Sequence, residues 1–363
     1  MRKLSELCIQ SEFYEPETRD GFFVCGLMKR AWAVQLEILS ELDRICRLYN
    51  IRWYADWGTL LGTVRHGGFV PWDDDIDVCM LRKDYDKFLE IVDKELRDDY
   101  NIVQPFDSRN IMRGIVSRLV NTTSVNFNDE YLKKSHGFPY ICGVDIFPLD
   151  YVSGDVEEWE MHKNISILVG VTEKEWDNMT NEERAVRLED IESICEVGID
   201  REGDIRRQLI VLLDALARSG ADESSPYITS VSQAASGLSK KPFLKSWYDG
   251  IEYLSFEGIA VPVPRGYMEV LECLYGETYM TPIIGASGHD YPFFLSQKED
   301  VQRYLKVNKG YENRENYVAD MMGMQRVEVC EYKLIERGEK EDAYLYFCQS
   351  RMIIIHIPHG IEK

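Results

Sequence analysis

An acidic run followed by apolar residues is the sequence feature that most constrains the fold. Residues 73–77 read Asp-Asp-Asp-Ile-Asp and continue into an apolar segment. A strand there would place Asp75 and Asp77 on one face and the intervening apolar side chains on the other. Neighbouring carboxylates repel each other when both are ionised, unless a divalent cation or a basic group compensates them. The pattern favours a strand that enters a core and carries a carboxylate pair over a solvated acidic loop.

A short helix is predicted shortly before this strand. Gly58 and Thr59 follow the apolar, strand-like residues 51–55 and open the helical segment 60–64. A helix N-terminus beside a glycine exposes N–H groups suited to phosphate oxygens. We therefore interpret Gly58 and Thr59 as a phosphate-binding turn. A phosphate cradle beside a carboxylate pair indicates metal-assisted transfer of a phosphorus centre.

Two other metal motifs contain similarly spaced aspartates. An EF-hand is excluded, because Val78 stands where that loop requires glycine and Asp84 where it requires a bidentate glutamate. A sugar-nucleotide glycosyltransferase can also bind its metal through Asp-x-Asp. The Gly-Thr helix start favours nucleotidyltransferase-like geometry instead.

Four segments taken in order carry a family resemblance. They are Gly-Thr-Leu-Leu-Gly-Thr-Val-Arg-His at 58–66, Gly-Phe-Val-Pro-Trp-Asp-Asp-Asp-Ile-Asp-Val at 68–78, Gly-Val-Asp-Ile-Phe-Pro-Leu-Asp at 143–150, and residues 256–282. This series closely resembles the LicD family of phosphocholine transferases, which includes the fukutin-related proteins. The likeness covers about residues 25–285 and is loose over 155–240. Trp57 departs from the family, which more often has glycine there.

The resemblance implies an α+β nucleotidyltransferase fold of the polymerase β type, in which helices flank a mixed sheet. Asp75 and Asp77 match the family's paired metal ligands, and Asp145 matches the third catalytic carboxylate, on a neighbouring strand. The implied cofactor is Mg²⁺, with Mn²⁺ as a substitute. Apolar neighbours of Asp145 independently predict a buried strand, where an unpaired carboxylate is costly. The alternative for Asp145 is a structural pair with an arginine or a turn cap.

Further substrate contacts are predicted around these motifs. Arg65 is a candidate for the donor diphosphate, or else forms a salt bridge to Asp73 or Asp74. His66 either donates to phosphate or caps the helix, and Arg118 contacts either phosphate or a core carboxylate. A quaternary ammonium group requires aromatic rings or a carboxylate. The aromatic candidates are Trp53, Tyr54, Trp57 and Trp72, with Tyr291, Phe293 and Phe294 more distant.

The resemblance implies transfer of phosphocholine from CDP-choline to a sugar hydroxyl of a cell-surface glycan or glycolipid precursor, such as teichoic acid or lipopolysaccharide, with release of CMP. One alternative donor is CDP-ribitol or CDP-glycerol. A second alternative is a catalytically silent protein that binds a nucleotide or glycan.

Composition limits the partners. The formal charge of −21 over 363 residues argues against nucleic-acid binding and against simple electrostatic attachment to an anionic membrane. Nine cysteines without Cys-x-x-Cys spacing indicate reduced thiols. No segment is apolar enough for a membrane span. We expect a cytoplasmic protein, with transient membrane association at most.

The sequence divides into four parts. Residues 1–25 read as a loosely structured lead-in, and 26–285 as the transferase domain. Within it, residues 155–240 read as an inserted helical lobe that ends in a mobile connection. Residues 286–363 form a C-terminal extension with a strand-like segment near 352–357.

Overall fold

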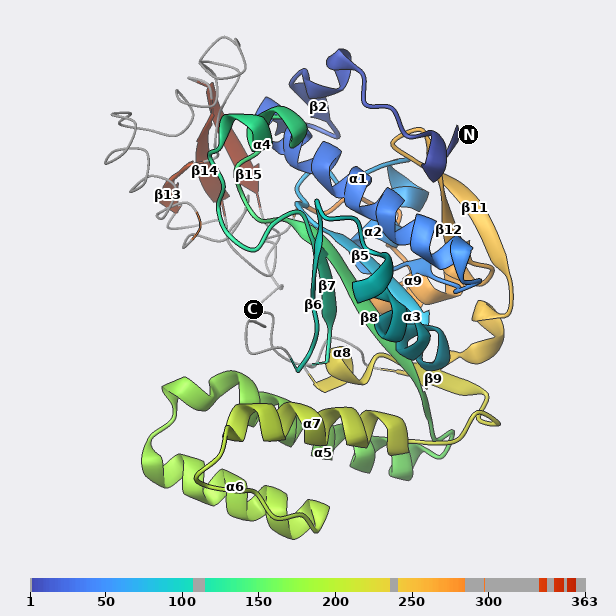
Figure 1. Ribbon diagram of the computed structural model, residues 1–363, viewed down its shortest axis with the longest axis vertical. Helices are drawn as coiled ribbons and strands as arrows, with labels where there is room; N and C mark the ends of the chain where they lie inside the picture. The colour runs from blue at the N-terminus through green and yellow to red at the C-terminus, as the bar shows by residue number, and fades with distance from the viewer. Residues whose placement is uncertain are drawn as a thin grey trace.

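The computed structural model describes residues 2–106, 115–235, 241–284, 297, 333–337, 343–348 and 351–356. Helices flank a mixed sheet (Figure 1), which confirms the expected α+β class. Seven described strands form this main sheet: β4 (Tyr54–Ala55), β5 (Ile76–Leu81), β6 (Asn101–Val103), β7 (Ser117–Val120), β8 (Gly143–Val152), β9 (Tyr227–Thr229) and β10 (Phe243–Leu244).

The long strand β8 organises the main sheet. Strand β5 pairs with it in parallel along one edge, and β4 adds to β5 in the antiparallel sense. Along the other edge of β8, β7 pairs with its first half and β9 with its last residues, both antiparallel. Strand β8 therefore aligns residues from four separate segments of the chain.

Helices cover both faces of the β5–β8 pair. On one face, Ile76, Val78 and Val144 belong to the same hydrophobic cluster as α1 (Gly26–Leu48). On the other, Leu81 and Leu149 pack with apolar residues of two further helices. These are α2 (Trp57–Arg65) and α9 (Tyr267–Tyr275). Asp77 of β5 and Asp145 of β8 lie on this second face, at the start of both strands.

The apolar stripe of helix α1 explains how this helix packs against the sheet. Its predicted apolar stripe is buried along the whole length, at Met28, Trp32, Leu36, Leu39, Leu42 and Ile45. This stripe covers the sheet and the next helix, α3 (Arg82–Glu95), whose Tyr85, Phe88 and Val92 join the same cluster. The short helix α4 (Asp129–Lys134) begins at Asn128, whose side chain caps it. Helical spacing of apolar residues in the sequence predicts helices at 27–49 and 83–96, and α1 and α3 confirm both to within a residue or two at each end.

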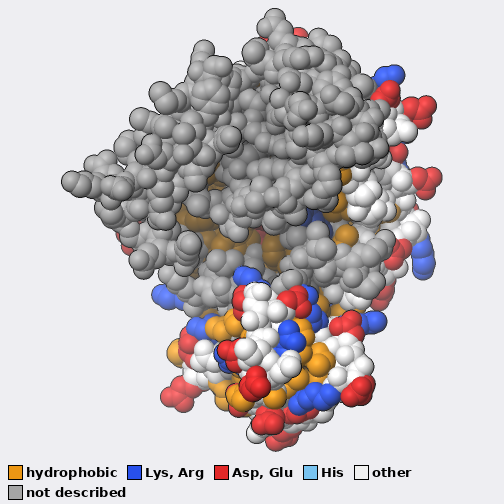
Figure 2. Space-filling view, turned by 90° about the vertical axis from the view of Figure 1, so that its left-hand side faces the viewer, with side chains coloured by type: hydrophobic (Ala, Val, Ile, Leu, Met, Phe, Trp, Pro, Cys, Tyr) orange, Lys and Arg blue, Asp and Glu red, His pale blue; other side chains and the backbone are white. Residues whose placement is uncertain are grey.

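The helices expected between residues 154 and 220 form a lobe at the lower end of the molecule in Figure 1. It consists of α5 (Val156–Glu175), α6 (Asn181–Cys195) and α7 (Ile205–Ser219). Its core is a hydrophobic cluster that includes Trp159, Leu188 and Leu213 and continues to Val152 of β8. Figure 2 shows hydrophobic side chains between acidic and basic ones on this lower part, where exposed residues include Met161, Val186, Ile194 and Val211.

Two segments that were expected to be irregular contain regular elements. Residues 1–25 are not a loose lead-in, because they contain β1 (Arg2–Lys3), which pairs with β12 (Ile259–Pro264), and the hairpin of β2 (Glu17–Arg19) and β3 (Phe22–Val24). The predicted mobile connection holds β9 and α8 (Val231–Ala235), and β9 belongs to the main sheet. In both segments, short elements are stabilised by strand partners that are distant in sequence.

The sequence predicts a hairpin over 252–263 that turns at Glu257 and Gly258, followed by a helix over 267–275, and both are present. Strand β11 (Ile251–Phe256) turns into β12 at Glu257 and Gly258, which both have positive φ, as a tight hairpin requires. In the C-terminal extension, β13 (Lys333–Arg337), β14 (Ala343–Cys348) and β15 (Arg351–His356) form a separate antiparallel sheet. The predicted strand near the end of the chain is therefore present as β15.

Candidate active site

Asp77 and Asp145 are direct neighbours across the parallel pair β5–β8. The register aligns Asp77 with Asp145, and Arg118 of β7 with Asp145 from the opposite side. Residues aligned across a sheet project from the same face, so the three side chains form a row. The predicted proximity of residue 145 to residue 77 is confirmed by this register.

Burial and the surrounding carboxylates both raise the pKa of Asp77. Burial raises the pKa of Asp77 well above its usual value, and the negative charges of Asp75, Asp145, Asp73 and Asp56 raise it further. Five acidic side chains from three segments therefore share one electrostatic neighbourhood. Carboxylate oxygens are the ligands that Mg²⁺ prefers, and a cation at this position would relieve the repulsion. The donor set fits a divalent metal.

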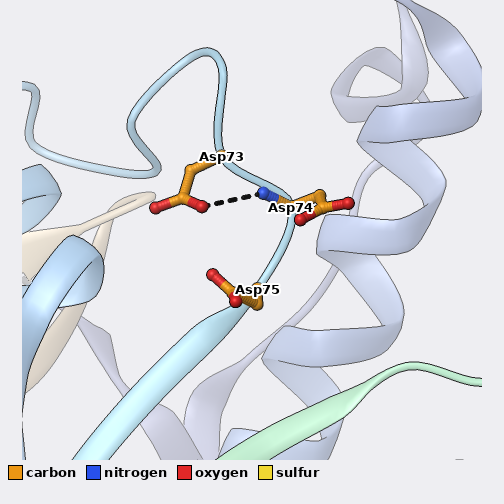
Figure 3. Close-up of side chains that lie close together, drawn as sticks. All are labelled: Asp73, Asp74 and Asp75. Atoms are coloured by element: carbon orange, nitrogen blue, oxygen red, sulfur yellow. Dashed lines mark hydrogen bonds between the residues drawn. The ribbon is translucent and has the colours of Figure 1, made fainter. Parts of the chain in front are cut away.

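The acidic run itself forms the closest carboxylate cluster found in the described ranges. One oxygen each from Asp73, Asp74 and Asp75 lies within 4.8 Å of the others. Figure 3 shows the side chains of Asp73 and Asp75 facing each other, while Asp74 points to the opposite side. Asp73 was not predicted as a site residue from the sequence. Its position in the acidic run 73–77 is the feature that could have indicated it. The structure adds Asp73 to the candidate site.

The N-terminus of α2 meets this cluster. Asp56 caps the helix by accepting a hydrogen bond from the backbone N–H of Trp57 at 3.0 Å. A Cβ placed on Gly58 would lie 2.2 Å from Oδ2 of Asp73, so only glycine leaves room for that carboxylate. The predicted anion-binding turn at Gly58 is thus contacted by carboxylates of the chain itself. Burial is the main cause that raises the pKa of Asp56 to about 6.

Thr59 fixes α2 against β5 and is itself buried. Its hydroxyl accepts a hydrogen bond of 2.8 Å from the backbone N–H of Asp77, and the N–H of Asp56 donates to the carbonyl of Asp77 at 3.0 Å. Both backbone polar groups of Asp77 are therefore satisfied by the segment that starts α2. In this structure the Thr59 hydroxyl positions Asp77.

Trp57 occupies an unusual backbone conformation. Its φ is 42°, in the left-handed region that favours glycine and costs other residues about 1–2 kcal/mol. Glycine would adopt this conformation without that cost. The Trp57 ring meets the ring of Tyr275 edge-on, with centroids 6.3 Å apart.

Tyr275 is a site residue that was not predicted from the sequence. It ends α9 and lies within the segment 256–282 that carries part of the family resemblance, which is the one signal for it. Burial raises the pKa of Tyr275 well above its usual value, with further contributions from Asp73, Asp77 and Asp56. Its phenol therefore lies within the field of the acidic cluster.

Arg65 and His66 end α2 and bind each other. The Arg65 guanidinium donates to Nε2 of His66 at 2.8 Å and to the carbonyl of Tyr279 at 2.8 Å. The alternative predicted for Arg65 was a salt bridge to Asp73 or Asp74, whereas its hydrogen bonds described here join it to His66 and Tyr279. His66 is the C-cap residue, and its Nδ1 lies 2.7 Å from Asp20. Because Nε2 accepts from Arg65, Nδ1 carries the proton and donates to Asp20.

Arg118 pairs with a core carboxylate, which was one of its two predicted roles. Its Nε lies 3.0 Å from Oδ1 of Asp145, so Asp145 also has the arginine partner considered for it. Burial lowers the pKa of Arg118, but Asp145 and Asp75 outweigh it and hold that pKa above the usual value. A Cβ on Gly143 would lie 2.9 Å from the Arg118 side chain, so this glycine makes room for it.

The aromatic residues predicted to contact a quaternary ammonium group differ in how far they are buried. Trp53 and Tyr54 are buried in the core. Trp57 and Trp72 are partly exposed, and the Arg65 guanidinium lies 5.9 Å from the Trp72 ring centroid. Tyr291, Phe293 and Phe294 lie outside the described residues.

Comparison with known proteins identifies the family of this arrangement. Residues 50–165 match the LicD/FKTN/FKRP nucleotidyltransferase domain. The chain carries a LicD-family domain. It is 26% identical over 253 residues to the lipopolysaccharide cholinephosphotransferase LicD of Haemophilus influenzae, across 69% of this chain and 90% of the relative. An uncharacterised protein of Rickettsia typhi is 32% identical over 66 residues, 18% of this chain and 21% of the relative.

The matched LicD domain contains every site residue that the sequence predicted, from Trp57 to Asp145. Tyr275 lies C-terminal to it, on a helix that packs against α2. Over the described ranges, no helix is both long and apolar enough to cross a membrane. The structure gives free thiols at Cys8, Cys25, Cys46, Cys79, Cys142, Cys195 and Cys273.

Proposed function

We propose that this protein transfers phosphocholine from CDP-choline to a sugar hydroxyl of a cell-surface glycan or its lipid-linked precursor, and releases CMP. The observation that carries the proposal is the alignment of Asp77 with Asp145 beside Asp75, at the start of α2. The Haemophilus influenzae relative is a lipopolysaccharide cholinephosphotransferase, which supports the choice of head group and acceptor class.

In the proposed reaction, the sugar oxygen forms a bond to the phosphorus that bears choline. The bond from that phosphorus to the bridging oxygen breaks, this oxygen leaves as part of CMP, and the hydroxyl proton passes to Asp145 or to water. Asp75, Asp77 and Asp145 would hold Mg²⁺, or Mn²⁺ in its place, which when bound would neutralise charge on the diphosphate. The α2 N-terminus and Arg65 would bind oxygens of the donor phosphates, and these new contacts would replace the ones they make in this structure.

Arg118 has a defined part in this proposal. Its guanidinium pairs with Asp145 in the absence of ligands. When the donor binds, the guanidinium would either stay paired with Asp145 or turn to a donor phosphate. The reaction would take place in the cytoplasm, with transient membrane association for a lipid-linked acceptor.

A donor panel tests the proposal. The protein is incubated with MgCl₂, a lipopolysaccharide or teichoic acid acceptor, and CDP-choline, CDP-ribitol or CDP-glycerol in turn, and CMP release is measured. We expect release from CDP-choline, and a loss of at least about 10³-fold in Asp75→Asn and Asp77→Asn. Preference for a CDP-alditol would reassign the donor. Absence of both turnover and cytidine-nucleotide binding would favour a catalytically silent protein.

A further inference from the structure

The partly exposed aromatic pair beside the acidic cluster has no evident role in folding. Trp57 and Tyr275 meet edge to face, at 84° between ring planes, and come from different elements, α2 and the end of α9. The exposed fraction of Tyr275 is 38%, whereas Trp53 and Tyr54, close to Trp57 in sequence, are at most 3% exposed. The pair thus forms a wall at the molecular surface, outside the core.

The backbone at Trp57 points to a ligand role for this wall. A tryptophan at φ 42° is strained, and glycine would adopt the same conformation without that cost. Strain of this kind persists where the surrounding structure holds it, and it concentrates at ligand-binding positions. Neither Trp57 nor Tyr275 belongs to the hydrophobic clusters formed by the described residues, so packing in those clusters does not account for the strained position of the indole.

The surroundings define the chemistry of that ligand. Gly58, next to Trp57, abuts the carboxylate of Asp73, so carboxylate oxygens lie beside the aromatic wall. Two aromatic faces next to carboxylates favour a cation that is large, weakly hydrated and without N–H donors. We propose that Trp57 and Tyr275 bind the quaternary ammonium of the donor and determine selectivity for it over a primary ammonium. This inference rests on the proposed function and assigns its head-group specificity.

Donor selectivity tests the assignment. KM is measured with MgCl₂ and acceptor for CDP-choline and for CDP-ethanolamine, whose primary ammonium can donate hydrogen bonds. Trp57→Gly removes the ring and relieves the backbone strain, and Tyr275→Leu removes the second ring. In each variant we expect KM for CDP-choline to rise about tenfold and KM for CDP-ethanolamine to change less than about twofold. Trp57→Phe, which retains a ring, should recover most of the selectivity.

The controls separate this inference from the proposed function. Tyr253→Leu removes an exposed aromatic ring on β11 and should leave the ratio of the two KM values unchanged. If the wild-type protein releases CMP from CDP-choline but Trp57→Gly and Tyr275→Leu keep its KM ratio, the head-group assignment is overturned and the function stands. Equal increases in KM for both donors would also overturn it. If the wild-type protein turns over neither donor, the proposed function itself fails.

Discussion

The two ends of the parallel pair β5–β8 use the same residue type in opposite ways. At the start of the strands, Asp77 and Asp145 lie side by side among further aspartates. At their far end, about 16 Å away by strand rise, Asp150 of β8 faces Arg82, the first residue of α3. Arg82 donates to both carboxylate oxygens of Asp150, at 2.6 and 2.9 Å.

The far end is a complete ion-pair network that attaches the lobe. The Arg82 guanidinium also lies 3.0 Å from Asp214 of α7, and Arg218 of the same helix binds Asp214 and Asp86 of α3. Here two arginines, Arg82 and Arg218, pair with three carboxylates. Burial raises the pKa of both Asp150 and Asp77, but Arg82 opposes this rise at Asp150, whereas the neighbouring aspartates add to it at Asp77. The difference indicates that the far end serves stability, whereas the near end tolerates repulsion because its compensation comes from a ligand.

The sharpest test makes the same substitution at both ends. Asp150→Asn should lower the free energy of unfolding by about 3 kcal/mol, because it leaves the buried Arg82 with one carboxylate partner fewer. Asp77→Asn should leave it unchanged or raise it by about 1 kcal/mol, because it removes a repelling charge. Urea unfolding at neutral pH without added metal measures both. Similar losses in the two variants would show that both ends are structural.

A pH series sharpens the comparison. The folded-state pKa of Asp77 is raised, so the native protein binds its proton more tightly than the unfolded chain does. The stability that this group contributes is complete below about pH 4, its unfolded value, and is lost as pH rises through the native value. Wild type should therefore lose about 1 kcal/mol relative to Asp77→Asn between pH 4 and 8. Added MgCl₂ should reverse this loss in the wild-type protein only, as thermal unfolding would show.

Patterns that are local in sequence predicted most of the fold. The buried stripe of α1 follows from helical spacing, and the β11–β12 hairpin from a turn at Glu257 and Gly258. Alternation also placed Asp145 on a strand, where the register confirms its proximity to Asp77. In each case, residues close in sequence determine the element.

Features that depend on distant partners were not predictable in this way. Strand β1 has only two residues and exists because β12 supplies its hydrogen-bond partner. Tyr275 reaches the site because α9 packs on α2, and no spacing rule relates residue 275 to residue 57. The choice between a phosphate and Asp145 as partner of Arg118 likewise required the β7–β8 register. Pairing at long sequence separation carries this information, and the local pattern does not.

The smallest expected effect lies within the far-end network itself. Arg82 and Arg218 both bind Asp214, but the side chain of Arg82 is 10% exposed and that of Arg218 is 43% exposed. Water and salt screen the pairs of Arg218, and its loss leaves Asp86 hydrated and Asp214 still paired with Arg82. Arg218→Ala should therefore cost about 0.5 kcal/mol, against about 3 kcal/mol for Arg82→Ala. Urea unfolding of both variants and of the double variant measures the coupling. A loss in Arg218→Ala as large as that in Arg82→Ala would mean that the two arginines attach the lobe as one cooperative unit, so that exposure alone does not set the strength of each pair.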